Sequence, residues 1–264
     1  MIDFFRELFV KRIKLDTKIL PSQGLFYKKD FEINIKKASK EDILDYEKNY
    51  VKDDIGTVIY LIKKIVEKNI KLSGGYVYED IKSIDIIFIF LEIVKITKGK
   101  PINLMYFDKE TDKEGKIEFG SKYFNYFQFT NKLLQNYSNE DRSFTINGYK
   151  YTLPSIGVEN SLTNFLIVKS SEEDAFNYNN YAYDFTYFVG DKNNLKFKEI
   201  ENLIQIFNFD MDKDEMKKMK EVIKTFLPLQ RYSLKKDGRV VEMNSKINLE
   251  KIWKWYLIYS LWEY

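Results

Sequence analysis

The most apolar stretch of the chain is Ile84–Ile96, with the sequence IDIIFIFLEIVKI. Asp85, Glu92 and Lys95 interrupt it, and it is shorter than the roughly 20 apolar residues that a membrane-spanning helix needs. We therefore predict a helix over residues 80–98 that is buried inside a domain. Gly99 follows directly and Pro101 comes two residues later, a sequence typical of a helix end.

A strand and two helices are predicted before this buried helix. Apolar and polar residues alternate over 31–35, as in a half-buried strand. Ser39 and Asp42 have the spacing of a capping box and predict a helix that continues to Asn49. A second helix is predicted over 54–68, because its apolar residues recur on one face.

The same patterns predict the remaining elements. The clearest signal is Asn147-Gly148 between alternating residues, which is typical of a type I′ hairpin. We expect a helix over 1–13; strands over 102–106 and 116–119 joined by a turn at 112–115; hairpins over 144–153 and 234–243; and helices over 196–208, 213–226 and 248–262.

Strands and helices are mixed along the chain without a βαβ rhythm. The predicted fold class is therefore α+β, with helices packed on short antiparallel sheets and hairpins. A polar, tyrosine-rich segment over 170–194 is predicted to be a surface excursion or linker. It would separate an N-terminal α+β domain, 1–169, from a mainly helical C-terminal part with a hairpin, 195–264.

The composition limits the chemistry that the chain can perform. Its 264 residues include no histidine and no cysteine, which excludes Ser-His-Asp and Cys-His triads and thiol chemistry. Aromatic residues make up 17% of the chain, which indicates contact surface rather than catalysis. The net charge of +3 is too balanced to favour nucleic acid or an anionic membrane as the partner. We predict a protein that is not an enzyme and uses no cofactor.

Two acidic clusters are candidate sites of chemistry. Asp210, Asp212, Asp214 and Glu221 have the spacing of a calcium-binding loop, but Glu215 occupies the position where glycine makes the turn. We favour acids that cap a helix.

The second acidic cluster consists of Asp108, Glu110, Asp112 and Glu114. Carboxylates on facing strands could form an acid/base pair. Lysines are interleaved with them, so solvated turn charges are the favoured interpretation.

Aromatic residues interleaved with Lys122, over 122–129, could stack on nucleobases. The run alternates densely and has little positive charge, so a core or protein-interface role is favoured.

Both ends of the chain carry candidate partner-binding surfaces. The N-terminal residues have helical spacing with a narrow apolar stripe that either docks on its own domain or on a neighbour. The aromatic residues near the C-terminus would surround most of a helix, so part of that surface should meet another protein. The predicted interface residues are Phe4, Phe5, Leu8, Phe9, Trp253, Trp255, Tyr256, Tyr259 and Trp262.

Three pieces over residues 19–108 share the order of motifs in one protein family. They are the Leu20–Tyr27 segment LPSQGLFY, the strand 31–36 that leads into the capped helix, and the helix 84–93 followed by KGKPINL over 98–104. In this order, they resemble the baseplate hub-assembly proteins of T-even-type contractile-tailed phages. Where that family usually carries Arg after a Phe-Leu pair, this chain has Lys95 at the comparable position.

The resemblance implies a non-enzymatic structural or assembly protein of a contractile phage tail baseplate. Its partners would be other baseplate or tail proteins, with several copies in a symmetric assembly. A membrane would not be among the partners. It would be located in the virion tail baseplate, and in the host cytoplasm during assembly. The implied entry turn contains Leu20, Pro21, Ser22, Gly24 and Tyr27, and the implied core helix contains Asp85, Phe88, Phe90 and Leu91.

Two alternative functions stay open at the level of sequence. The chain could be a transient tail-assembly chaperone that is absent from the mature virion. It could also be a phage-encoded protein that binds nucleic acid or a host factor.

Overall fold

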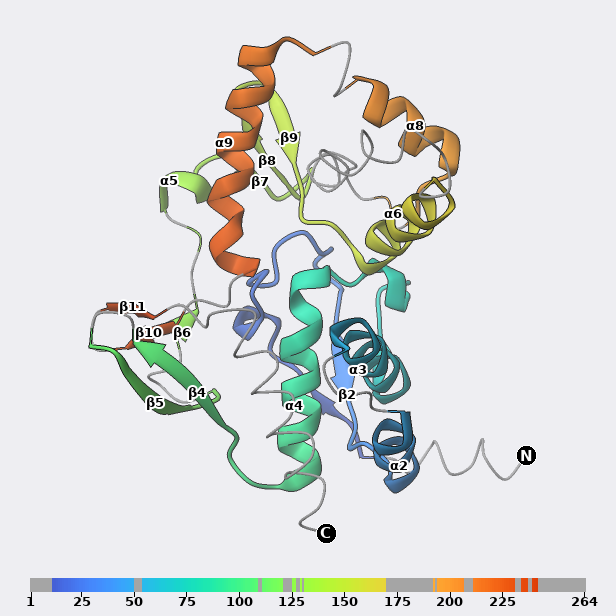
Figure 1. Cartoon of the computed structure of the whole chain (residues 1–264), viewed down its shortest axis with the longest axis vertical. Coiled ribbons are helices and arrows are strands. Elements are labelled where there is room, and N and C mark those ends of the chain that lie inside the picture. Colours follow the sequence, from blue (N-terminus) through green and yellow to red (C-terminus); the bar gives the residue numbers. More distant parts are fainter. Residues whose placement is uncertain are drawn as a thin grey trace.

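The computed structural model describes residues 11–49, 54–108, 111–120, 125–126, 129, 131–169, 192, 194–206, 211–230, 234–236 and 239–241. These residues form an α+β fold, which confirms the predicted class. In Figure 1, one group of helices and strands lies below another, and two small hairpins lie to one side of α4.

The lower group is built around α4 (Ile86–Lys98), which packs against α3 (Ile55–Asn69) and β2 (Ile33–Ile35). β2 lies between β1 (Ile13–Lys14) and β3 (Ile70–Leu72) in an antiparallel sheet. Buried side chains from this sheet, from α3 and from α4 form the largest hydrophobic cluster, the main core. α4 is apolar on nearly every side because neighbours cover it, as the sequence of 84–96 predicts.

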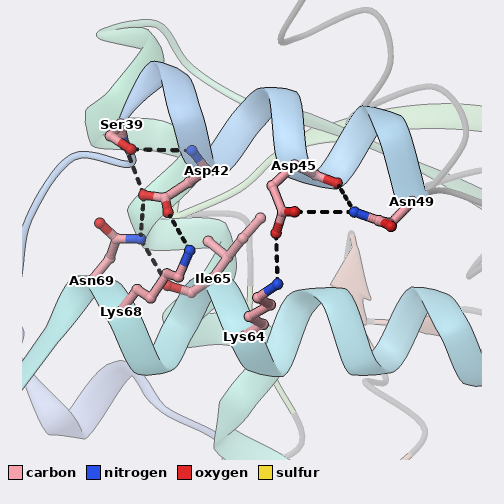
Figure 2. A network of polar contacts seen from close by, with 8 residues as sticks. All are labelled: Ser39, Asp42, Asp45, Asn49, Lys64, Ile65, Lys68 and Asn69. Atoms are coloured by element: carbon pink, nitrogen blue, oxygen red, sulfur yellow. Dashed lines mark hydrogen bonds and ion pairs between the residues drawn. The ribbon is translucent and has the colours of Figure 1, made fainter.

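Local capping fixes where the helices begin and end. Ser39 and Asp42 exchange hydrogen bonds at the start of α2 (Lys40–Asn49), with N–O distances of 3.0 and 3.1 Å, which confirms the capping box (Figure 2). Asp54 caps α3 by accepting the N–H of Thr57. Gly99 ends α4 in the left-handed conformation, with φ of 64°.

The upper group combines a small sheet with three longer helices. The sheet contains β7 (Tyr137–Ser138), β8 (Ser143–Ile146) and β9 (Tyr149–Tyr151), and α5 (Asn131–Leu134) precedes it. The helices are α6 (Ile156–Lys169), α8 (Phe197–Gln205) and α9 (Lys213–Gln230). Two further clusters of buried side chains fill this group, one between the sheet and α9 and one between α6, α8 and α9. We call the first of these the second core.

Two hairpins complete the described fold. β4 (Asn103–Asp108) pairs with β5 (Lys113–Glu118), and β10 (Leu234–Lys236) pairs with β11 (Arg239–Val241). β10 also pairs with β6 (Asn125–Tyr126). The predicted hairpins are confirmed, and the type I′ turn has positive φ at both Asn147 and Gly148, 54° and 83°.

Several predicted boundaries are wrong. Residues 11–12 are not helical and Ile13 belongs to β1, so the helix predicted over 1–13 does not extend that far. Residues 80–85 form 3₁₀ turns and a connection rather than the start of α4. Lys113–Gly115 belong to β5 instead of the predicted turn, and α9 continues past residue 226.

The sequence patterns do not predict β1, β3, β6, α5, β7 or any part of α6. The proposed linker over 170–194 lies outside the described residues except for Lys192 and Asn194. The division into domains therefore stays a prediction, although Val158 and Leu162 share a cluster with Ile200 and Met219. None of the helices in the described ranges is long and apolar enough to cross a membrane.

Candidate functional site

The segment Leu20–Tyr27 is a tight turn. Gln23 N–H donates to the Leu20 carbonyl at 2.8 Å, and Leu25 N–H donates to the Ser22 carbonyl at 3.0 Å. Gly24 has φ of +72°, and a Cβ there would lie 2.9 Å from Oγ1 of Thr17. The position therefore requires glycine, because a side chain would be both strained and too close to its neighbour.

The turn is held from inside the molecule by the carboxylate of Asp85, which is 0% exposed. Oδ1 accepts the backbone N–H of Ser22 at 2.9 Å, and Oδ2 accepts the hydroxyl of Tyr27 at 2.8 Å. The Tyr27 oxygen in turn accepts the backbone N–H of Lys82 at 2.8 Å. We call this group of four residues, Ser22, Tyr27, Lys82 and Asp85, the motif junction.

Burial changes the protonation chemistry of the motif junction. It raises the pKa of Asp85 to about 6, although hydrogen bonds from Ser22 and Tyr27 and the nearby charge of Lys82 act in the opposite direction. Burial also lowers the pKa of Lys82 to about 8, against the effect of the Asp85 charge. The pKa of Tyr27 is raised well above its usual value, again mainly by burial. At neutral pH, Tyr27 is therefore a neutral donor beside a carboxylate and an ammonium group.

The motif junction also ties the lower group to the upper one. Ser83 N–H donates to the Pro154 carbonyl at 3.0 Å, and Ile156 N–H donates to the Ile81 carbonyl at 2.8 Å. Lys82 and Ser155 form an antiparallel bridge between these bonds. The chain just before α6 is thus fastened to the segment that precedes α4.

Phe26 makes a second connection between the groups. Its ring is 2% exposed and lies 5.6 Å from the ring centroids of Tyr137 and Phe144 in the second core. Its backbone N–H donates to the Tyr137 hydroxyl at 2.8 Å. Leu20 and Tyr27, at the two ends of the same turn, belong to the main core. One short turn therefore contributes to both cores.

A cavity of about 270 Å³ lies beside the motif junction. Its polar lining comes from five separate parts of the chain and consists of Lys28, Tyr76, Asp80, Lys82, Arg142, Ser155 and Lys192. Tyr76 Oη accepts the backbone N–H of Lys28 at 2.6 Å, and Asp80 Oδ2 accepts the N–H of Val77 at 2.8 Å. The cavity is thus lined by several cationic side chains and by one carboxylate, which already accepts a hydrogen bond from the backbone.

The structure brings together the residues implied by the family resemblance. Leu20, Pro21 and Ser22 are buried in the turn, and Asp85 binds the turn as described. Phe88, Phe90 and Leu91 of α4 are 2%, 2% and 6% exposed and lie in the main core. The aromatic residues of both predicted terminal interfaces lie outside the described residues.

One of the two acidic clusters caps a helix. Asp212 Oδ1 accepts the N–H of Asp214 at 2.7 Å at the start of α9, which confirms a helix cap. In the other cluster, the register pairs Asp108 with Lys113, and Phe107 with Glu114, so those two acids are not opposite each other. No group of three or more acids within the described ranges is placed to hold a metal ion.

The cavity and its lining could not be predicted from the sequence. Lys82, Tyr76 and Arg142 are separated from Lys28 by long stretches of chain, and no motif links them. One local signal was present: Lys82 stands between apolar residues at Ile81 and Ile84, where a solvated lysine is not expected.

We compared the chain with protein family models, with curated proteins and with solved structures, and none of the three comparisons gave a match.

Proposed function

We propose that this chain is a non-enzymatic structural or assembly protein of a contractile phage tail baseplate. It would act through contacts with other baseplate or tail proteins, in several copies in a symmetric assembly. The proposal rests on the resemblance over residues 19–108 and on one observation, the motif junction.

The motif junction supports the proposal because it accounts for the motif residues by structure alone. The Asp85 carboxylate accepts one hydrogen bond on each oxygen, and the Tyr27 hydroxyl both donates and accepts. These groups are fully engaged with each other and with the backbone. The motif is therefore better explained as a device that holds a turn between two cores than as an acid/base site.

A protein of this kind needs surfaces that bind neighbours and a scaffold that keeps them in place. The double connection through Asp85 and Phe26 would supply that rigidity. The terminal segments with Phe4, Phe5 and Trp253 among their residues remain the predicted adhesive surfaces. The location would be the virion tail baseplate, with passage through the host cytoplasm during assembly.

The first experiment is quantitative mass spectrometry on purified particles of the phage whose genome encodes this chain. We expect the chain at a fixed ratio to known tail proteins, which would support a structural role. Absence from particles, together with co-purification of tail proteins from infected cells, would favour the transient chaperone. Absence from both fractions would overturn the tail-protein proposal and favour the binder of nucleic acid or a host factor.

A variant pair tests the predicted C-terminal interface in the same preparation. Replacing Trp253, Trp255 and Trp262 with alanine should release the chain from particles or from tail-protein complexes. The control replaces Lys251 and Lys254 in the same segment with alanine and should leave incorporation unchanged. Equal incorporation of both variants would contradict the assignment of the aromatic residues as an interface.

A further inference from the structure

The cavity beside the motif junction is rich in hydrogen-bond donors and poor in acceptors. Lys28, Lys82, Arg142 and Lys192 all line it, and they come from separate segments of the chain. The charge of Lys192 is already paired with Glu199, at 2.7 Å, so the other three carry the argument. Asp80 is the one acid among the described lining residues, and its carboxylate already accepts a backbone N–H at 2.8 Å. The wall is therefore electropositive even though the whole chain is nearly balanced in charge.

Lys82 is the most informative residue of this wall. It is only 4% exposed, and its backbone N–H is used by the Tyr27 hydroxyl. Its ammonium group makes no hydrogen bond or ion pair within the described part of the chain, and it lines the cavity. A buried ammonium without an acceptor is costly, so an anion in the cavity would offset part of that cost.

Two neutral side chains add donors to the same cavity. The Tyr76 oxygen accepts the N–H of Lys28 at 2.6 Å, and the Ser155 oxygen accepts the N–H of Val158 at 3.3 Å. Each hydroxyl therefore has its acceptor side in use, and among the described residues neither proton has an acceptor. Both protons can be donated to a bound oxygen atom.

We propose that this cavity binds a phosphate group, either as free phosphate or as the phosphate of a small metabolite, with Lys82 as its central ligand. A phosphate group offers several acceptor oxygens and up to two negative charges, which suits several cations and two hydroxyl donors better than a single carboxylate does. The volume of about 270 Å³ lies just below the range of drug-sized ligand pockets, which favours a small ligand. The inference does not depend on the proposed role in a phage tail.

The test is isothermal titration calorimetry on the full chain at low ionic strength, with inorganic phosphate and adenosine monophosphate as separate ligands. We expect saturable, one-to-one binding of at least one of them. Tighter binding of the monophosphate would identify an esterified phosphate as the ligand, and equal or tighter binding of inorganic phosphate would identify the free ion. Acetate at the same ionic strength should bind at least about tenfold more weakly, because it carries one charge.

Two variants locate the site. Lys82→Met keeps the length of the buried side chain and removes its charge, and it should weaken binding by about tenfold or more. Lys28→Gln changes a more accessible member of the same wall and should weaken binding less, so it tests the site even if the first variant folds poorly. The control is Lys48→Gln, an exposed lysine on α2 that does not line the cavity, which should bind like the unmodified chain.

Three results would overturn the proposal. One is the absence of saturable binding of both phosphate ligands to the unmodified chain. Another is folded Lys82→Met and Lys28→Gln proteins that bind as tightly as the control. The third is acetate binding that equals phosphate binding, which would indicate general screening of positive charge.

Discussion

Tyr27 uses one hydroxyl group for two buried hydrogen bonds. It donates to Asp85 at 2.8 Å and accepts from the Lys82 backbone at the same distance, while its ring stacks on Phe31 with centroids 3.9 Å apart. Tyr27→Phe keeps the stacked ring and leaves the Lys82 N–H and one carboxylate oxygen without this partner. We expect a loss of about 1–3 kcal/mol in the free energy of unfolding, measured by urea denaturation.

A control for Tyr27→Phe is available at an exposed tyrosine. Tyr60 is 63% exposed on α3, and Tyr60→Phe should change the free energy of unfolding far less. Equal losses of stability in the two variants would mean that the buried hydrogen bonds of the Tyr27 hydroxyl do not stabilise the fold.

Asp85 predicts an unusual pH dependence of stability. Its pKa is about 6 in the folded chain against 3.8 without burial, so between those values the folded state holds a proton that the unfolded state has released. The contribution of Asp85 to the free energy of unfolding is therefore fully present below pH 3.8 and is lost as pH rises through about 6. The change is on the order of 2–3 kcal/mol.

The measurement for Asp85 compares the chain with Asp85→Asn by urea denaturation at several pH values from 4 to 7. Asn keeps an acceptor for the Ser22 N–H and does not titrate. Subtracting the two curves removes the effect of the other carboxyl groups. As pH rises, we expect the free energy of unfolding of the unmodified chain to fall relative to that of Asp85→Asn. A difference between the two that does not change with pH would contradict a raised pKa for Asp85.

The contact between α2 and α3 gives a prediction at the scale of elements. Figure 2 shows two acids of α2, Asp42 and Asp45, that face α3. Asp42 is 8% exposed and accepts from the Ser39 N–H, from Lys68 Nζ and from Asn69 Nδ2. Asp42→Ala should lower the free energy of unfolding by about 1–3 kcal/mol, because it removes a cap and an acceptor for a buried amide.

Asp45 on the same helix supplies the matched control for Asp42. It pairs with Lys64 at 2.7 Å, but both side chains are 36% exposed, and such pairs contribute little. Asp45→Ala should therefore cost clearly less. Burial would raise the pKa of Asp42, but its hydrogen bonds outweigh burial and lower the pKa. The contribution of Asp42 to the free energy of unfolding should therefore be lost as pH falls below about 4. Equal losses for the two variants at neutral pH would contradict this difference.

The elements that sequence predicted are those with a local signal. The Ser39 capping box and the Asn147-Gly148 turn depend on residues close together in the chain. α6 has no such periodic signal: it contains the apolar run 165–168, in which Phe165 is buried while Ile167 is 65% exposed. β1 and β3 have two and three residues, too few for an alternating pattern to be visible.

The candidate site also has residues that the sequence points to and contacts that only the folded structure shows. The family resemblance points to the turn Leu20–Tyr27 and to Asp85, yet nothing in their spacing predicts that Asp85 binds the turn. Ser22 and Asp85, which share a hydrogen bond, are 63 residues apart in the sequence and meet only through tertiary packing. The cavity needs a further segment that carries Arg142, so its assembly depends on the whole fold.

At the scale of the molecule, the turn Leu20–Tyr27 couples the main core to the second core. Leu20 and Tyr27 belong to one, and Phe26 belongs to the other. Phe26→Ala should remove the ring that fills the space between Tyr137 and Phe144, at a cost of about 3–5 kcal/mol in the free energy of unfolding. Because the lost contacts are all in the second core, β7–β9 should open more readily than α4.

Hydrogen–deuterium exchange resolved along the chain measures this uncoupling directly, since it reports the opening of each segment. In Phe26→Ala, amides of β8 and β9 should lose protection while those of α4 keep most of theirs. Phe26→Leu keeps most of the apolar volume and should show a smaller effect in the same segments. Phe88→Ala, in α4 beside Phe119, should instead expose the main core. A uniform loss of protection in Phe26→Ala would mean that the two cores open together and that the turn is not the weak point between them.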